Sequence, residues 1–368
     1  MTNTKKWIDD IKRVEPPDLW DRIEQGTASG SVGSPSPSPR PLLAVAILAV
    51  TALVLGTTFY WLGQFGERSV VGGTVNKSVR PAGIHRLFVS LEESFDESRS
   101  QVVAIHPRTG EAVGLPLMDG YVGDVSVSPD GRMLALAVYG EGGDYSIATM
   151  DLDGSSYAPV ANFADEINGL GDVSWSPDGT RIAFATTVSP PEMTTEADLI
   201  RDLYVISLED GSITRVTQDD HITGFSWSPD GTRFVVSRER AEDRRLMNDL
   251  FIMGVDGTDE GRLTDDGISS RPAWSLQGQI AFIGSASGDF KHRDVFILDE
   301  EGTSLVQLTD DTAVEEGLAW SADGSRLAYT KFTGPRCSVL IQPVTGDRPA
   351  KLVVDGSDMG GCPISLTW

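Results

Sequence analysis

The feature that most constrains the fold is a short phrase that recurs along the chain. Ser-Pro-Asp-Gly occurs at Ser128–Gly131, Ser176–Gly179 and Ser228–Gly231, and relaxed forms of it occur at Ser275–Gly278 and Ser321–Gly324. The residues directly before these copies are Val127, Trp175, Trp227, Trp274 and Trp320, and the chain ends on Trp368. A spacing of 46 to 52 residues predicts an array of structural repeats.

Each repeat contains four short β-rich runs separated by turn residues. In the second repeat the first run ends at Trp175, and the Pro and Gly of the following phrase suit the second and fourth positions of a type I turn. The second run is Arg181–Ala185 and the third is Asp202–Ile206. The fourth run is brief and ends in Thr, as in Arg215–Thr217, Arg262–Thr264 and Gln307–Thr309. Four such runs predict one blade of a β-propeller.

The two ends of the repeat region complement each other. Residues 86–118 supply runs two, three and four without a first run, and Ile364–Trp368 supply a first run with nothing after it. Joined, they complete a sixth blade and leave no open sheet edge. The predicted fold class is therefore all-β, a six-bladed β-propeller over residues 81–368 with a split closing blade. It is preceded by one transmembrane helix and a short helical cytoplasmic tail.

The repeated Trp-Ser-Pro-Asp-Gly, followed by a basic residue and Ile-Ala-Phe or its equivalents, resembles the WD-like repeats of the TolB propeller family. Similar repeats occur in the propellers of prolyl oligopeptidases. The resemblance covers about three quarters of the chain and implies a TolB-type propeller in the cell envelope. Before the propeller this chain differs from TolB, which has a cleaved signal and an α/β domain there.

An uncharged and almost wholly apolar stretch, residues 42–62, lies before the repeats. As a helix it would be roughly 32 Å long at about 1.5 Å per residue, enough to cross a bilayer. Because 41 residues precede it, we interpret it as a retained signal anchor; a buried core helix is the alternative. The basic residues before it favour a cytoplasmic N-terminus and an extracytoplasmic propeller. Residues 26–41 form a Gly/Ser/Pro linker before the span, and residues 63–80 form a juxtamembrane linker after it.

The sequence pattern of residues 1–25 predicts a cytoplasmic amphipathic helical segment. Trp7, Ile8 and Ile11 fall on one helical face, and a second short helix after Pro16-Pro17 carries Leu19, Trp20 and Ile23. The segment resembles the cytoplasmic part of membrane-bound anti-sigma factors, which implies a sigma factor as the partner of these six residues. The alternative is a pair of helices that rest on the membrane surface.

The excess negative charge lies in the propeller. Residues 81–368 contain 47 acidic and 21 basic side chains, which argues against nucleic acid as a partner. Acidic pairs begin the crossings between blades, on the same face as the long links from run two to run three, such as Arg238–Asn248. A collar of these acids would attract a cationic protein partner; the alternative is that they only maintain solubility. The candidate binding residues are Asp219, Asp220, His221, Asp265, Asp266, Asp310 and Asp311.

The two cysteines, Cys337 and Cys362, both lie beyond the predicted span. An even count in an oxidising compartment favours a disulfide between them. The alternative is two unrelated buried thiols, if their Cα atoms lie more than about 7 Å apart.

No catalytic, cofactor or metal signature stands out. The chain has no Gly-x-Ser-x-Gly elbow, and its four histidines show no ligand spacing. The leading hypothesis is therefore a non-catalytic, membrane-anchored extracytoplasmic propeller that binds a protein or ligand without a cofactor. The alternatives are a transmembrane sensor or anti-sigma-like regulator that signals through residues 1–25, and the accessory domain of an enzyme.

Overall fold

The computed structural model of the chain describes residues 87–92, 100–115, 120–140, 143–164, 167–188, 200–218, 220–242, 245–258, 261–286, 288, 292–334, 336–346, 348–356 and 362–368. The predicted tail, linkers and transmembrane span, residues 1–80, lie outside this part of the chain. Among the described residues, no helix has the length and apolar character needed to span a bilayer.

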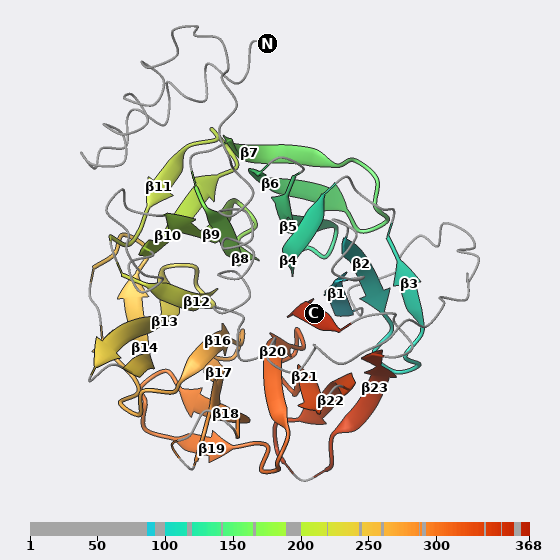
Figure 1. Ribbon diagram of the computed structural model, residues 1–368, viewed down its shortest axis with the longest axis vertical. Helices are drawn as coiled ribbons and strands as arrows, with labels where there is room; N and C mark the ends of the chain where they lie inside the picture. The colour runs from blue at the N-terminus through green and yellow to red at the C-terminus, as the bar shows by residue number, and fades with distance from the viewer. Residues whose placement is uncertain are drawn as a thin grey trace, which may run out of the picture. The chain divides into compact units, whose positions relative to one another are not determined.

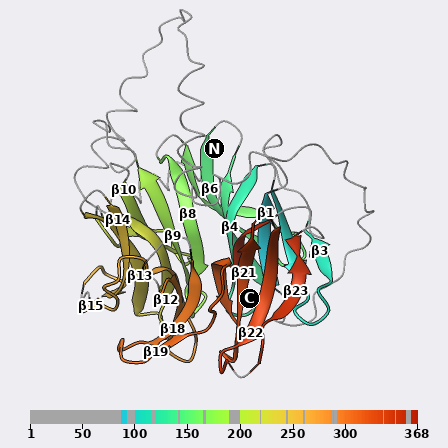
Figure 2. The same ribbon diagram turned by 60° about the horizontal axis from the view of Figure 1, so that its bottom comes forward.

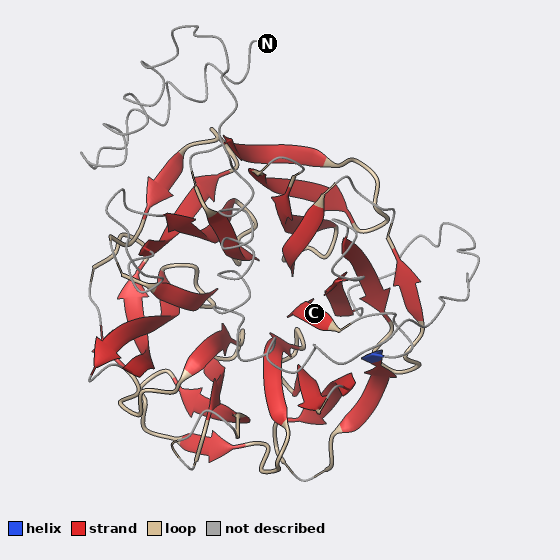
Figure 3. Cartoon of the chain, viewed as in Figure 1, coloured by secondary structure: helices blue, strands red, loops and turns tan. Residues whose placement is uncertain are grey.

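The described residues form six four-stranded antiparallel sheets around one axis (Figures 1 and 3). Blade 1 contains β4 (Tyr121–Val127), β5 (Met133–Tyr139), β6 (Asp144–Asp151) and β7 (Ala158–Ala164). Blade 2 contains β8 (Gly169–Trp175), β9 (Arg181–Val188), β10 (Ile200–Ser207) and β11 (Ile213–Arg215). Blade 3 contains β12 (Ile222–Trp227), β13 (Arg233–Glu242), β14 (Arg245–Gly254) and β15 (Gly261–Arg262).

The other three blades complete the ring. Blade 4 contains β16 (Ser270–Trp274), β17 (Gln279–Gly284), β18 (Asp294–Asp299) and β19 (Leu305–Gln307). Blade 5 contains β20 (Val314–Trp320), β21 (Arg326–Thr333), β22 (Arg336–Pro343) and β23 (Lys351–Asp355). Blade 6 joins the two ends of the propeller and contains β24 (Pro363–Thr367), β1 (Leu87–Glu92), β2 (Ser100–Ile105) and β3 (Ala112–Gly114).

The ring closes as the split repeat predicts. β24 pairs with β1 in antiparallel register, with Leu366 opposite Val89 and Thr367 opposite Phe88. The inner strands β4, β8, β12, β16, β20 and β24 contact one another in a closed cycle around the axis. The strands of each blade run between the two faces of the ring (Figure 2). The prediction of six blades with a shared closing blade is confirmed.

The repeated Ser-Pro-Asp-Gly forms the corner between the first two strands of a blade. At Ser228 the hydroxyl donates to Asp230 Oδ1 at 2.6 Å and accepts the Arg233 N–H at 2.9 Å, while Gly231 takes φ of 67°. The Ser228 hydroxyl, followed by the N–H and hydroxyl of Thr232, lowers the pKa of Asp230 to about 2. The corner is therefore an Asp-bonded turn that needs Gly at its left-handed position.

The aromatic and basic residues of the repeat join neighbouring blades. The Arg181 guanidinium of blade 2 lies 4.8 Å from the ring centre of Trp227 in blade 3, and Arg326 of blade 5 lies 4.9 Å from Trp368. Such cation–π contacts contribute about 1 kcal/mol each. The apolar core lies between blades as well, because each cluster of buried side chains draws on two adjacent sheets. The blades are therefore held together by side chains from both neighbours.

Two details of the predicted strands are wrong. The fourth strands end at Arg215, Arg262 and Gln307, before the predicted Thr. That Thr turns its hydroxyl back to the third strand, where Thr217 Oγ1 accepts the Leu203 N–H at 3.0 Å. The segment 238–248, predicted as a long loop, instead extends the β13–β14 hairpin, with Arg238 opposite Asp249. Arginines on this hairpin pair with acidic residues of the crossings, which favours the ordered ladder over an open loop.

Candidate functional site

Six equivalent residues lie near the axis, one from each inner strand. In blades 1 to 5, this residue lies three positions before the residue that directly precedes the repeated Ser-Pro-Asp-Gly phrase. In blade 6 it lies three positions before Trp368. We call this set the axial ring: Asp124, Asp172, Gly224, Arg271, Gly317 and Ser365. Because adjacent inner strands contact each other, the fold brings together residues that lie 46 to 52 positions apart in the sequence.

A bulge or register shift accompanies the axial ring in every blade. The shifts fall at Val122/Asp124, Leu170/Val173, Ile222/Gly224, Ser270/Ala273, Glu316/Leu318 and, on β1 opposite β24, Ser90/Leu91. Bulges re-aim side chains and are frequent beside functional sites. Arg271 has φ of 50°, the value also found at its equivalent Gly317. A left-handed backbone conformation is unfavourable by roughly 1–2 kcal/mol for a non-glycine residue. The conformation of Arg271 therefore lowers the free energy of unfolding of the domain.

Asp124 and Asp172 form the acidic side of the axial ring. Asp124 Oδ2 accepts the Val173 N–H of the next blade at 2.6 Å, and Oδ1 accepts the hydroxyl of Ser365. Burial, followed by the negative charge of Asp172, raises the pKa of Asp124 to about 7. Burial also raises the pKa of Asp172, against the opposing charge of Arg271. Both shifts favour the protonated carboxyl groups, because burial and mutual repulsion oppose the ionisation of both at once.

Arg271 lies in blade 4, three blades from Asp124, and forms the basic side of the ring. Its Nη2 lies 3.2 Å from Glu316 Oε2, and Glu316 Oε1 accepts from Arg293 Nη1 at 2.8 Å. The charge of Glu316 raises the pKa of Arg271, whereas burial lowers the pKa of Arg293. The side chains of Arg271 and Glu316 remain 31% and 13% exposed. This ion-pair network is thus deep in the domain but still in contact with solvent.

A tyrosine cluster supports the start of β8 near Asp172. The hydroxyl of Tyr139 donates to the Leu170 carbonyl, and the hydroxyl of Tyr145 donates to the Asn168 carbonyl at 2.9 Å. The ring of Tyr139 makes edge contacts with those of Tyr121 and Tyr145, at centroid distances of 5.5 and 5.3 Å. Burial raises the pKa of Tyr139, so its hydroxyl stays a neutral donor. These contacts fix the strand that carries Asp172.

The chemistry available to the axial ring is charge recognition and proton binding. Two neighbouring carboxyl groups with raised pKa values, and a guanidinium carried on a left-handed backbone, are suited to hold a charged group of a ligand. Among the described residues, no group of three or more His, Cys, Asp or Glu side chains is placed to hold a metal ion.

The predicted collar residues lie at the crossings, where several engage their own blade. Asp220 pairs with Arg238 at 3.5 Å, Asp265 pairs with Arg262, and Asp311 pairs with Lys331. Asp266 accepts the N–H groups of Ile268 and Ser269. Asp310 is exposed, and Asp219 lies outside the described residues. The backbone carbonyl of His221 accepts a hydrogen bond from the Glu239 N–H. Basic side chains therefore neutralise part of the charge expected for the collar.

A buried aspartate in three blades explains part of the crossing pattern. Asp202, at 2% exposure, accepts from Arg215, Thr217 and the Asp220 N–H, at 2.5, 2.9 and 3.3 Å. Asp249 and Asp294 occupy the same place in the next two blades. The segments with a Thr and an Asp pair, 217–220, 264–267 and 309–311, are thus also structural, because they donate hydrogen bonds to a buried carboxylate.

Cys337 and Cys362, the pair expected from the sequence, are joined by a disulfide. Their Cα atoms are 5.7 Å apart, within the range that a disulfide spans. Cys337 is the second residue of β22, and Cys362 directly precedes β24. The bond therefore ties blade 5 to the strand that closes the ring.

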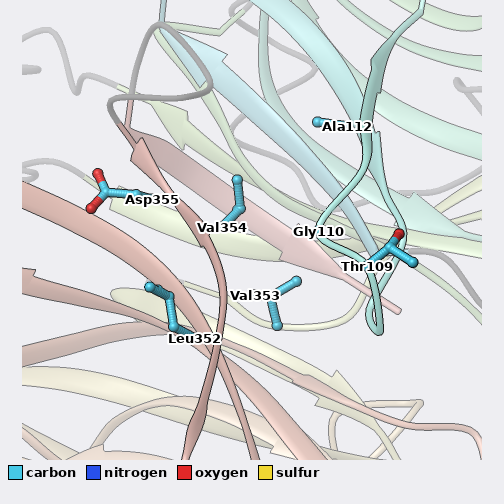
Figure 4. A pocket seen from close by; sticks show the side chains of 7 residues that line it. All are labelled: Thr109, Gly110, Ala112, Leu352, Val353, Val354 and Asp355. Atoms are coloured by element: carbon cyan, nitrogen blue, oxygen red, sulfur yellow. The ribbon is translucent and has the colours of Figure 1, made fainter.

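A hollow of about 430 Å³ lies between the β2–β3 turn and β23 (Figure 4). It is lined by Thr109, Gly110, Ala112 and residues 352–355. A Cβ on Gly110 would lie 2.3 Å from the Val353 carbonyl oxygen, which shows how closely the turn approaches the strand. The hollow contains one carboxylate, Asp355, and no group from the axial ring.

The axial ring was not predicted from the sequence, although a signal for it exists. Three positions before the aromatic, the six repeats have Asp, Asp, Gly, Arg, Gly and Ser, whereas the neighbouring repeat positions are mostly apolar or small. The other repeats have a small residue at this position, so the fold does not require a charge there. Charged residues at such a position indicate a role in function.

These features define the class of the protein: it is a closed six-bladed β-propeller, and the comparisons show that it is similar to TolB propellers. No family model matches the chain. A curated TolB homolog from Chlorobium luteolum is 22% identical over 304 residues, which are 78% of this chain and 64% of that protein. A dipeptidyl-peptidase 5 from Porphyromonas endodontalis is 28% identical over 144 residues, which are 35% of this chain and 20% of that protein. The chain thus spans less than two thirds of the length of both relatives.

The solved structures agree on the fold. TolB from Acinetobacter baumannii superposes with a TM-score of 0.60 and 20% sequence identity, over 77% of this chain and 66% of that one. A propeller of the nidogen–laminin complex superposes with a TM-score of 0.56 at 11% identity, over 77% of this chain and 97% of that one. At these identities the likeness extends to the fold alone.

Proposed function

We propose that this chain is a non-catalytic binding protein of the cell envelope, whose propeller lies outside the cytoplasm and binds a protein partner over the axial ring. The likeness to TolB propellers supports an envelope role. The partner would dock on the face that carries the acidic crossings, which lead directly into the inner strands of the axial ring.

The observation that carries this proposal is the charged character of the axial ring. Three of the six equivalent positions are Gly224, Gly317 and Ser365, so the fold builds inner strands without charge there. Asp124, Asp172 and Arg271 instead place desolvated charges near the axis, and Arg271 does so in a left-handed backbone conformation. Such groups reduce stability unless another charge compensates them, which favours a role in binding.

A membrane anchor at residues 42–62 is part of the proposal. The uncharged stretch is long enough to span a bilayer, and it precedes a domain with a disulfide. Disulfides persist in oxidising compartments, which supports an extracytoplasmic propeller and a cytoplasmic N-terminus.

The second candidate function is a transmembrane sensor that signals through residues 1–25. It is favoured by the apolar helical faces of that segment, with Trp7, Ile8 and Ile11 on the first and Leu19, Trp20 and Ile23 on the second. In this version, occupancy of the propeller would change how the tail engages a sigma factor. Capture of a sigma factor by the intact chain, lost on Trp7→Ala and Trp20→Ala, is the expected result.

The main test is chemical crosslinking in cells with the full-length chain, followed by identification of the crosslinked proteins. One specific protein should be captured by the native chain and lost with Asp124→Asn/Asp172→Asn. It should be retained with Glu111→Gln, an exposed residue of the closing blade. Equal capture by all three chains would refute a site at the axial ring. Protease added to spheroplasts, whose cytoplasmic membrane is intact, should degrade the propeller, and protection of the propeller there would refute the proposed orientation.

A further inference from the structure

The charges of the axial ring and of the adjacent Glu316 and Arg293 do not balance within the described residues. Two guanidinium groups, Arg271 and Arg293, both pair with Glu316. The other two carboxyl groups, Asp124 and Asp172, form no ion pair within 4 Å of a cationic nitrogen in the described part of the chain. The acidic side of the ring therefore has room for one more positive charge.

Asp172 differs from Asp124 in its hydrogen bonds. Asp124 accepts from Val173 and Ser365, whereas the Asp172 carboxylate accepts no hydrogen bond from any described residue. It lies deep in the domain and is only partly exposed to solvent. Its Oδ2 faces Gly224, where an added Cβ would lie 3.4 Å away, so this position of blade 3 presents no side chain to it. A deep carboxylate without a donor, next to a position without a side chain, is suited to meet a donor from outside.

We propose that Asp124 and Asp172 bind the ammonium group of a lysine side chain from the protein partner, and that this group replaces a proton held between the two carboxyl groups. This inference rests on the proposed function. The proton leaves to solvent and the lysine remains charged, so one positive charge exchanges for another. No covalent bond forms or breaks apart from that O–H bond.

Geometry favours an ammonium group over other cations. The two carboxyl groups come from the neighbouring inner strands β4 and β8, and a compact group with three donors can donate to both of them. A guanidinium is a planar group that pairs best with the two oxygens of a single carboxylate, in the same plane. The lysine stem is long, apolar and unbranched, which allows it to carry its charge to a recessed carboxyl group. A metal ion would find two carboxylates, with the guanidinium of Arg271 close to Asp172.

The proton exchange predicts a pH dependence of definite sign. The charged or titratable groups around the pair are Arg271, Glu316, Arg293 and Tyr139, with Tyr121 and Tyr145 behind Tyr139. The arginines stay charged and the tyrosines neutral between pH 5 and 8, so the pair itself is the group that titrates. Binding of a cation should weaken by about tenfold per pH unit below neutrality, because one proton must leave for each cation bound.

The test is calorimetric titration of the full-length chain with propylammonium chloride, at pH 6, 7 and 8, with 1-propanol as the neutral control. Saturable binding of propylammonium at pH 8 is expected, with the affinity falling as pH falls. Titrations in buffers of different ionisation enthalpy should show release of one proton near pH 6. Asp172→Asn should reduce the affinity at pH 8 by at least about tenfold and abolish proton release. Glu111→Gln, on an exposed side chain of the closing blade, should change neither.

Several outcomes would overturn the proposal. These are no saturable binding at pH 8, equal binding of propanol, equal binding by Asp172→Asn, or saturable binding of calcium chloride without binding of propylammonium. If Asp172→Asn fails to fold, Asp124→Asn provides the same comparison. If the native chain binds propylammonium but captures no protein in cells, the ammonium site stands and the proposed protein-binding function fails alone.

Discussion

Replacement of Glu315 by Gln should remove much of the pH dependence of the stability of the propeller. Glu315 is fully buried at the start of β20, and neither of its carboxylate oxygens accepts a hydrogen bond from a described residue. The ammonium of Lys331 lies 3.6 Å from Oε1, but it also pairs with Asp311. Burial, followed by the negative charge of Asp311, raises the pKa of Glu315 from 4.5 to about 7.

The sign and size of the effect follow from this shift. Because the folded pKa lies above the unfolded pKa, the folded state holds the proton more tightly, and stability falls as pH rises from about 4.5 to 7. At 1.36 kcal/mol per pKa unit, the full effect of Glu315 is about 3 kcal/mol, which relaxation of the buried site will reduce. The glutamine variant does not ionise, so it should be more stable than the native chain at pH 8 and differ little at pH 4.5.

The measurement is urea unfolding of the full-length chain at pH 4.5, 6, 7 and 8, with the variant and the native chain compared at each pH. Glu111→Gln, on an exposed side chain, is the matched control and should follow the native curve. A smaller slope should remain in Glu315→Gln, because Asp124 also has a raised pKa. Parallel curves for the glutamine variant and the native chain would refute a buried, uncompensated Glu315.

Three further predictions concern ring closure, the disulfide and the crossings. Deletion of residues 364–368 should cause aggregation, because it leaves β1 as an open edge; a truncated chain that melts like the intact one would contradict this. Cys337→Ser should lower the free energy of unfolding by roughly 3 kcal/mol for a loop of 25 residues, and the denatured, unreduced native chain should show no free thiol. Conversion of the collar carboxylates to amides should slow association with a cationic partner and weaken its salt dependence, and an unchanged association rate would leave only a role in solubility. The residues for this last test are Asp219, Asp220, Asp265, Asp266, Asp310 and Asp311.

The sequence by itself determined the number of blades and the way the ring closes. A turn phrase such as Ser228–Gly231 folds through contacts among neighbours in the chain, so its repetition indicates each corner directly. The missing first run before Leu87 and the extra run at Ile364–Trp368 then require a shared blade, because an open sheet edge is unfavourable. The disulfide partners also followed from the sequence, since there are only two cysteines.

The tertiary structure decided which charged side chains meet. Asp124, Asp172 and Arg271 belong to three different repeats, and they come together only because six inner strands surround one axis. The same holds for the collar, where Asp220, Asp265 and Asp311 meet arginines and a lysine from other strands. The physical reason is range: turn and strand signals act over a few residues, whereas desolvation and charge pairing depend on every group within several ångströms, whatever its distance along the chain.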